Sequence, residues 1–144
     1  MEAQLFASKY SVVSVSEILP DGFSATLFSG SDGLVLGIAG TDWVNDIDDD
    51  AQLVFSELSG QFKSLVQYIE SLKSQNLIST TNKIHVSGHS LGGALTQMLV
   101  ATYPELIIDA YTYNAPGAKN LIAPSTLTID GKRYEIVSTD PLVT

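Results

Sequence analysis

The chain has 144 residues, which is enough for one domain with one hydrophobic core and short for two. Hydrophobic residues make up 44% of it, so a folded globular domain is favoured over a disordered chain. The net charge is -9 and the seven Lys and Arg residues are scattered, with Lys132 and Arg133 the one adjacent pair, which excludes an extended cationic surface for nucleic acid. Cysteine is absent, so disulfides, thiolate metal sites and a cysteine nucleophile are excluded as well.

The N-terminal residues carry no signal for export or membrane insertion. Met1–Gln4 lack the basic stretch and the apolar run of a secretory signal. No window approaches the roughly 18 unbroken apolar residues that a spanning helix needs. We therefore expect an extracellular protein, exported without an N-terminal signal, or a cytoplasmic one.

The N-terminal part is predicted to hold strands. Ala3–Leu19 is mixed, helical at first and with strand character around Val12–Val15. Gly22–Phe28 alternates apolar with small or polar residues, as a half-buried strand does. Ser31–Gly33 is predicted to form a tight turn. Leu34–Ala39 is a continuous apolar run, which is typical of a strand buried on both faces.

A long helix is predicted next. Asp42–Phe55 is acidic and irregular, whereas Glu57–Ser74 has the apolar spacing of an amphipathic helix. The helix is expected to end at Asn76 and the Ser79–Asn82 cluster. The helical apolar positions are Phe62, Leu65, Val66, Ile69 and Leu72.

The second half alternates strands with one helix. Lys83–Ser87 and Leu106–Tyr113 are predicted strands, and Leu91–Thr102 between them is a predicted helix with Leu95, Met98 and Leu99 facing inward. Thr126–Ile129 and Lys132–Ser138 are predicted to form a hairpin. The whole pattern predicts an α/β fold over residues 1–144, a single domain with a mainly parallel sheet, flanking helices and an antiparallel edge.

The stretch V-S-G-H-S-L-G-G-A-L, Val86–Leu95, has the spacing of a nucleophile elbow. Gly88 and Gly92 would let the strand turn sharply into the helix, leaving Ser90 at the turn. The unpaired N–H of Leu91 would then face a reacting carbonyl as an oxyanion-hole donor, worth roughly 3 kcal/mol in the transition state. The simpler alternative is a glycine-rich turn of the kind that dinucleotide-binding folds also use.

The G-H-S-L-G-G-A-L segment resembles the elbow of the class 3 lipases, a branch of the α/β-hydrolase fold. The resemblance extends over nearly the whole chain, and its phrasing is most similar to lipase domains of secreted, repeat-bearing bacterial proteins. The other stretches that carry it are Gly37–Asp42, Tyr111–Gly117 and Ile136–Val143.

The resemblance implies a role for each matching residue. Ser90 would be the nucleophile of a carboxylic ester hydrolase that works through an acyl-enzyme. Thr41 and Leu91 would form the oxyanion hole, and Asp140 would be the acid of the triad. The expected substrate is a lipid or small ester, met by transient contact with a lipid surface, and the chemistry needs no cofactor and no metal.

Two positions depart from the family pattern. Ala39 stands where the family usually has Arg, so the salt bridge of that Arg is missing. The larger departure is the triad base, because the sequence contains two histidines and neither follows Asp140. His89 adjoins Ser90 but is turned away by the elbow, and His85 lies inside a predicted strand as a buried, hydrogen-bonded residue.

Two explanations of the missing base stay open. In the first, the fold is incomplete at its C-terminus and the histidine lies beyond Thr144. In the second, the domain is a degenerate hydrolase that binds without cleaving. A phospholipase or an acyltransferase that uses the same serine is a further alternative, and a purely structural domain of a larger exported protein is another.

The Asp42–Asp50 segment contains five aspartates. It could form a calcium-binding loop or a solvated acidic loop. The segment lacks the glycine and the distant Glu of an EF-hand loop, so the solvated loop is favoured. Related lipases carry their lid at this point of the chain. We expect Trp43, together with His89, to contact substrate or lid, and the apolar residues up to Phe55 to belong to a flap.

Overall fold

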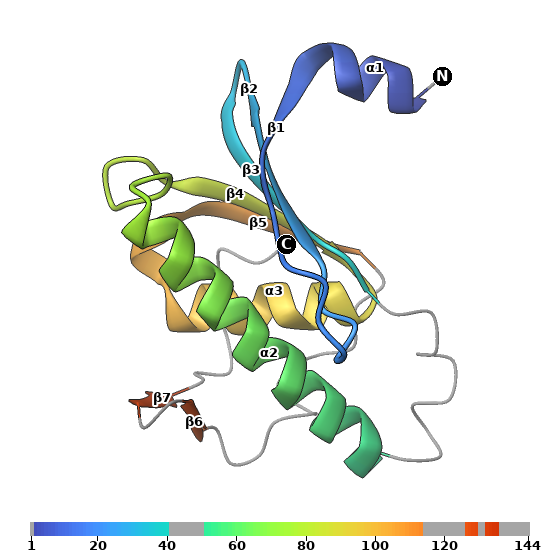
Figure 1. Cartoon of the computed structure of the whole chain (residues 1–144), viewed down its shortest axis with the longest axis vertical. Helices are drawn as coiled ribbons and strands as arrows, with labels where there is room; N and C mark the ends of the chain where they lie inside the picture. Colours follow the sequence, from blue (N-terminus) through green and yellow to red (C-terminus); the bar gives the residue numbers. More distant parts are fainter. Residues whose placement is uncertain (1, 41–50, 114–125, 130–131, 136–144) are drawn as a thin grey trace.

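A computed structural model describes residues 2–40, 51–113, 126–129 and 132–135 of the chain (Figure 1). Its main sheet has five strands in the order β1-β2-β3-β4-β5. The strands are β1 (Tyr10–Val15), β2 (Ala25–Gly30), β3 (Gly33–Ile38), β4 (Ile84–His89) and β5 (Ile107–Tyr113). The helices are α1 (Glu2–Lys9), α2 (Ala51–Ser74) and α3 (Leu91–Thr102), and a short 3₁₀ turn covers Pro104–Leu106.

The sheet is mixed, as its two halves differ in strand direction. β1 pairs with β2, and β2 with β3, in antiparallel fashion. β3 pairs with β4, and β4 with β5, in parallel. A parallel pair needs a long crossover, and α2 and α3 provide the two crossovers here. The predicted α/β fold with flanking helices and an antiparallel edge is confirmed. The main sheet is mixed rather than mainly parallel, because the antiparallel part extends over β1, β2 and β3.

One face of the sheet forms the hydrophobic core with α2 and α3. Both helices lie on that side of the sheet in Figure 1, and Leu27, Leu36 and Val86 beneath them are fully buried. Strand side chains alternate between faces, so the residues between these positions point the other way and are partly exposed. The helix residues that complete the core are Phe62, Leu65, Val66, Ile69 and Leu72 of α2 and Leu95, Met98 and Leu99 of α3.

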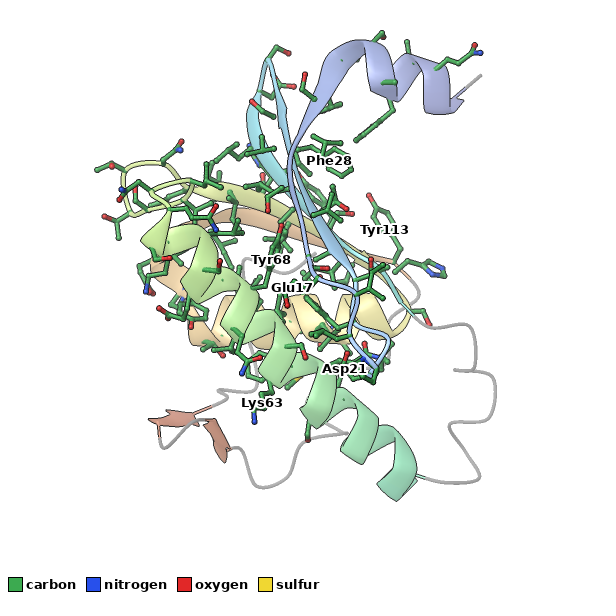
Figure 2. All side chains as sticks on the ribbon, in the orientation of Figure 1. Glu17, Asp21, Phe28, Lys63, Tyr68 and Tyr113 are labelled. Carbon is green, nitrogen blue, oxygen red and sulfur yellow. The ribbon has the colours of Figure 1, made fainter. Side chains whose placement is uncertain are left out.

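The opposite face of the sheet is covered only in part by the described residues. Phe6 of α1 meets the ring of Phe28 edge-on, with 4.9 Å between ring centroids. Figure 2 shows Phe28 and Tyr113 on the side of the sheet away from α2. Tyr113 is 57% exposed at the end of β5.

Two sequence predictions about element limits were wrong. Ala51–Phe55 is the first part of α2, not an irregular flap, since the helix begins at Ala51. The helix start was not predicted because the first turn of α2 carries no acidic residue, which is one of the usual signals of a helix N-terminus. Strand β4 runs to His89, two residues past its predicted end, because Gly88 and His89 pair with Thr112 and Tyr113 of β5.

The hairpin predicted near the C-terminus is confirmed in its described residues. Strands β6 (Thr126–Ile129) and β7 (Lys132–Glu135) pair antiparallel and form a separate two-stranded sheet. The predicted second strand extended to Ser138, and that extension lies outside the described residues. The same holds for Ile136–Val143, which the family resemblance assigns to the strand before the triad acid.

Tyr68 of α2 links the core helix to the edge strand β1. Its hydroxyl donates a hydrogen bond of 2.9 Å to Ser14 Oγ. Burial raises the pKa of the Tyr68 hydroxyl above its ordinary value of 10.0, and the hydrogen bond with Ser14 opposes the rise. The neutral phenol is therefore favoured in the folded state.

We expect Tyr68→Phe to change the alkaline stability of the protein. A pKa that folding raises contributes stability below the unfolded value, and the contribution is lost as the pH rises through the folded pKa. The wild type should lose stability more steeply than Tyr68→Phe above about pH 10. Below that pH the variant should be less stable by about 1 kcal/mol, the net worth of one hydrogen bond. Urea unfolding of both proteins at pH 7 to 11 measures this, and parallel curves would contradict it.

Candidate active site at the turn between β4 and α3

Ser90 forms the connection between β4 and α3. Its backbone has φ 58° and ψ -124°, one of two positive φ values among the described non-glycine residues. Such a conformation costs of order 1–3 kcal/mol and persists only where the surroundings enforce it. The serine is half-buried, so its side chain is accessible at the edge of the sheet where the parallel strands end.

Backbone hydrogen bonds hold the strained turn on both sides. The Ser90 N–H donates to the carbonyl of Tyr113 on β5 at 2.9 Å. The Ser90 carbonyl accepts from the N–H groups of Gly93 and Ala94, at 2.9 and 3.2 Å. The neighbouring strand and the first turn of α3 thus fix the residue between them.

Three glycines allow the surrounding backbone to approach the turn. A Cβ added at Gly88 would come closer than 3.0 Å to Gly92, and a Cβ at Gly92 would come equally close to the Ile38 carbonyl. A Cβ at Gly40 would collide with the His89 carbonyl. Real Cβ atoms do not make such contacts. The residues after β3 therefore lie directly against the elbow, as a shared oxyanion hole requires.

Leu91 is the first residue of α3, and its side chain is buried in the core. Within the described part of the chain its N–H makes no hydrogen bond, as is usual for the first N–H groups of a helix. A Cβ on Gly40 would lie 3.2 Å from the nitrogens of both Leu91 and Gly92. The first N–H groups of α3 thus lie beside Gly40, which follows β3.

Part of the predicted site lies outside the described residues. Thr41, which follows Gly40, is one of these, and so are Trp43, the aspartates of Asp42–Asp50, and Asp140. The structure therefore brings Ser90, Leu91 and Gly40 together. Among the residues it describes, no group of three or more His, Cys, Asp and Glu could hold a metal ion.

The two histidines occupy different surroundings. His89 ends β4 and is exposed. His85 Nδ1 lies 2.6 Å from Asp109 Oδ1, and His85 Nε2 lies 3.3 Å from the carbonyl of Asp32. Both ring nitrogens of His85 thus have partners. Ser90 follows His85 by five positions along the strand, which is roughly 16 Å at about 3.3 Å per residue.

The expectation for His85 is correct as to hydrogen bonding and wrong as to full burial. Its side chain is 25% exposed, and that of Asp109 is 33% exposed. Asp109 could not be identified as the partner of His85 from the sequence, because the two residues are brought together by the pairing of two strands and not by their spacing along the chain. His85 of β4 is paired with Asp109 of β5 in the strand register. This pair lies at the end of β4 that is far from Ser90.

No helix among the described residues combines the length and the apolar character needed to cross a membrane. That finding agrees with the absence of long apolar windows in the sequence.

The fold resembles that of solved lipases. One is a lipase from Yarrowia lipolytica, with a TM-score of 0.53 and 16% identity over 76% of this chain and 47% of that chain. Another is lipase II from Rhizopus niveus, with a TM-score of 0.50 and 18% identity over 81% of this chain and 52% of that chain. This chain thus spans about half the length of these lipases.

The comparisons show that the described fold is shared with these two lipases. No family model matches the sequence, and no curated protein matches it. The finer similarity to lipase domains of bacterial repeat proteins therefore finds no support among known sequences. At such low identity the resemblance concerns the fold, and the chemistry has to be argued from the residues of this chain.

Proposed function

We propose that this domain is a serine carboxylic ester hydrolase in which Ser90 attacks the ester and forms an acyl-enzyme. The observation that carries the proposal is the strained backbone of Ser90, at φ 58°, between a parallel strand and a helix. Strain of this kind is kept where it positions a functional group. A plain glycine-rich turn would place a glycine at that point and would need no hydroxyl.

The backbone around Ser90 supports an oxyanion hole. The N–H of Leu91 makes no hydrogen bond within the described residues, and the backbone of Gly40 approaches the same turn. Backbone donors aimed at a developing oxyanion stabilise it without reorganisation, at roughly 3 kcal/mol each. In this proposal Leu91 and Thr41 are the donors, and water later releases the acyl group.

Asp140 is proposed as the acid of the triad, and the histidine base is proposed to come from polypeptide outside these 144 residues. His85 is excluded as the base because both ring nitrogens are engaged at the far end of β4. His89 adjoins Ser90 along the chain, where the strained turn prevents a well-aligned proton transfer. A serine hydroxyl without a base is a weak nucleophile, so the base decides the rate.

The substrate is proposed to be a lipid or a small ester in an extracellular or cytoplasmic setting. The lipases with this fold are named for that activity, and the half-buried Ser90 leaves room for an acyl group. Trp43 and His89 are the residues proposed to touch substrate or lid. The proposed oxyanion donors contact only the ester carbonyl. The preference for acyl-chain length would therefore depend on Trp43 and His89.

Covalent trapping tests the nucleophile. The full-length product of the gene is incubated with an alkyl fluorophosphonate, and its peptides are mapped by mass spectrometry. We expect one phosphonate adduct, on Ser90, because the reagent reports an activated serine beside an oxyanion hole. An unmodified Ser90 in a folded full-length protein would place the domain among non-catalytic binding modules.

A further inference from the structure

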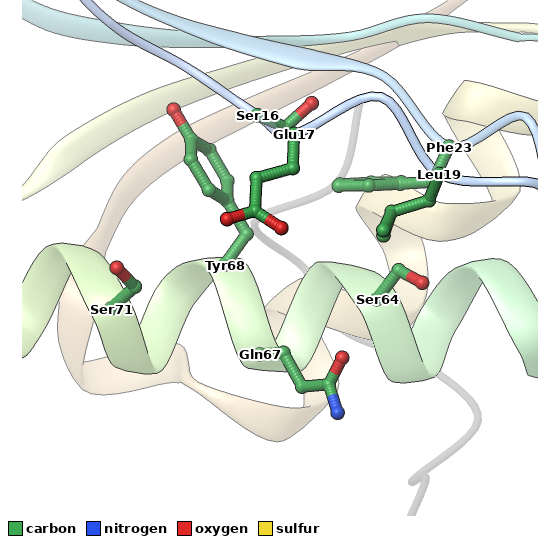
Figure 3. Close-up of a pocket in the computed structure, with 8 residues that line it drawn as sticks. All are labelled: Ser16, Glu17, Leu19, Phe23, Ser64, Gln67, Tyr68 and Ser71. Carbon is green, nitrogen blue, oxygen red and sulfur yellow. The ribbon is translucent and has the colours of Figure 1, made fainter.

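A cavity lies between α2 and the connection from β1 to β2 (Figure 3). Its volume is about 240 Å³, below the usual range of roughly 300–1,000 Å³ for drug-sized ligands. It therefore suits a ligand of a few heavy atoms. The lining residues are Ser16, Glu17, Leu19, Phe23, Ser64, Gln67, Tyr68 and Ser71.

The charge of this cavity is negative. Glu17 is its one charged lining residue, and the carboxylate makes no hydrogen bond or ion pair with the described residues. Figure 3 shows the Glu17 side chain pointing toward α2, between Tyr68 and Leu19. A second carboxylate, Asp21, stands just behind the wall, where it accepts a hydrogen bond from Ser64 Oγ.

No cationic side chain of the described residues pairs with that carboxylate. Neither Lys nor Arg is among the lining residues. Lys63 lies one turn before Gln67 on α2, and Figure 2 shows it directed away from Glu17. Lys63 also makes an interaction of its own. The carboxylate of Glu17 is thus available to a cation from solution.

Two aromatic rings, those of Phe23 and Tyr68, form part of the cavity wall. The rings of Phe23 and Tyr68 meet edge-on, with centroids 6.4 Å apart and planes at 62°. The Tyr68 ring is held in place because its hydroxyl is bonded to Ser14. Aromatic faces attract organic cations through their quadrupole, and the attraction is strongest where water is partly excluded.

The Asp21 side of the cavity is preorganised. The other carboxylate oxygen of Asp21 accepts from the Phe23 N–H at 2.9 Å, and the Asp21 carbonyl accepts from Gln61 Nε2 at 2.9 Å. Gln61 is fully buried, so this connection anchors the β1–β2 segment to α2. The two rings and the Asp21 carboxylate therefore keep their positions without a ligand, whereas the exposed Glu17 side chain makes no such contact.

We propose that this cavity binds a small organic ammonium compound, with the cationic group between the Glu17 carboxylate and the rings of Tyr68 and Phe23. The carboxylate supplies the charge attraction, and the rings contact the methyl or methylene groups around the nitrogen. The hydroxyls of Ser64 and Ser71 provide hydrogen bonds for a polar end of the ligand. The site is separate from Ser90, so it stands whether or not the domain cleaves esters.

Choline and its neutral isostere, 3,3-dimethyl-1-butanol, test the proposal. The two have the same shape and differ by the charge. In an ¹⁵N-labelled full chain, choline should shift the amide signals of Ser64, Gln67 and Ser71 saturably, and the isostere should bind at least about fivefold more weakly. Equal binding of the two compounds, or no saturable shift with choline, would overturn the proposal.

Matched variants assign the charge. Glu17→Gln keeps the size of the side chain and should weaken choline binding about fivefold, whereas Glu105→Gln, which removes one exposed carboxylate from the 3₁₀ turn, should leave it unchanged. Tyr68→Phe keeps the ring and should bind choline, and Tyr68→Leu should not. Equal effects of the two glutamate variants would reduce the binding to net charge and refute the site.

Discussion

Ser90→Ala is expected to abolish ester hydrolysis by the full-length protein, lowering kcat by at least about 10⁴-fold for a soluble short-chain ester. The hydroxyl is the atom that becomes acylated, and nothing else at the turn replaces it. Its removal leaves only the oxyanion donors and substrate binding, which accelerate the reaction modestly. Steady-state rates with a p-nitrophenyl ester give the comparison.

The design distinguishes loss of the nucleophile from loss of the fold. Ser87→Ala alters a half-buried serine of the same strand and should keep both the rate and the thermal midpoint. His85→Gln should also keep the rate, because His85 belongs to the Asp109 pair far from the turn. A large loss of rate in His85→Gln would refute the assignment of the base to polypeptide outside these residues. A Ser90→Ala enzyme that retains its rate would refute the nucleophile.

The 144-residue chain itself should hydrolyse the same ester far more slowly than the full-length protein. The described residues position Ser90 and the Leu91 N–H but bring neither histidine to the serine. The loss of one member of a catalytic triad lowers kcat by several orders of magnitude.

The parts of this structure that follow from local pattern were predictable from the sequence. The apolar spacing from Phe62 to Leu72 predicted the inward face of α2. The run from Leu34 to Ile38 predicted strand β3, of which one face is buried. The elbow was predictable for the same reason, since glycines at Gly88 and Gly92 are local and their spacing around Ser90 is compact. Each of these signals lies within a few residues of what it specifies.

Features that depend on pairing between distant segments were not predictable. The partner of the Ser90 N–H is the Tyr113 carbonyl, and the partner of His85 is Asp109. Both depend on the register between β4 and β5, which a single sequence does not encode locally. The cavity beside Glu17 likewise arises because Asp21 and Gln61 connect segments 40 positions apart. The start of α2 at Ala51 was missed because the aspartates before it, Asp48–Asp50, indicate a solvated loop as readily as a helix start.

Gly92→Ala is expected to destabilise the domain by about 3 kcal/mol, at the upper end of what overpacking costs. The added Cβ would collide with the Ile38 carbonyl, which is backbone of the central strand β3 and cannot move aside as a flexible side chain does. The helix would have to withdraw from the strand, and the Leu91 N–H would withdraw with it.

A matched glycine separates that collision from the general cost of changing glycine. Gly60→Ala lies inside α2, where an added Cβ would meet nothing within 4 Å, and it should be neutral or stabilise the helix by up to about 1 kcal/mol. Urea unfolding of the two variants and the wild type gives the free energies. Equal stability of Gly92→Ala and Gly60→Ala would mean that β3 and the elbow are not in contact. In that case the backbone of Gly40 would not be held beside the elbow, and the proposal of an oxyanion donor at the following residue, Thr41, would lose its support.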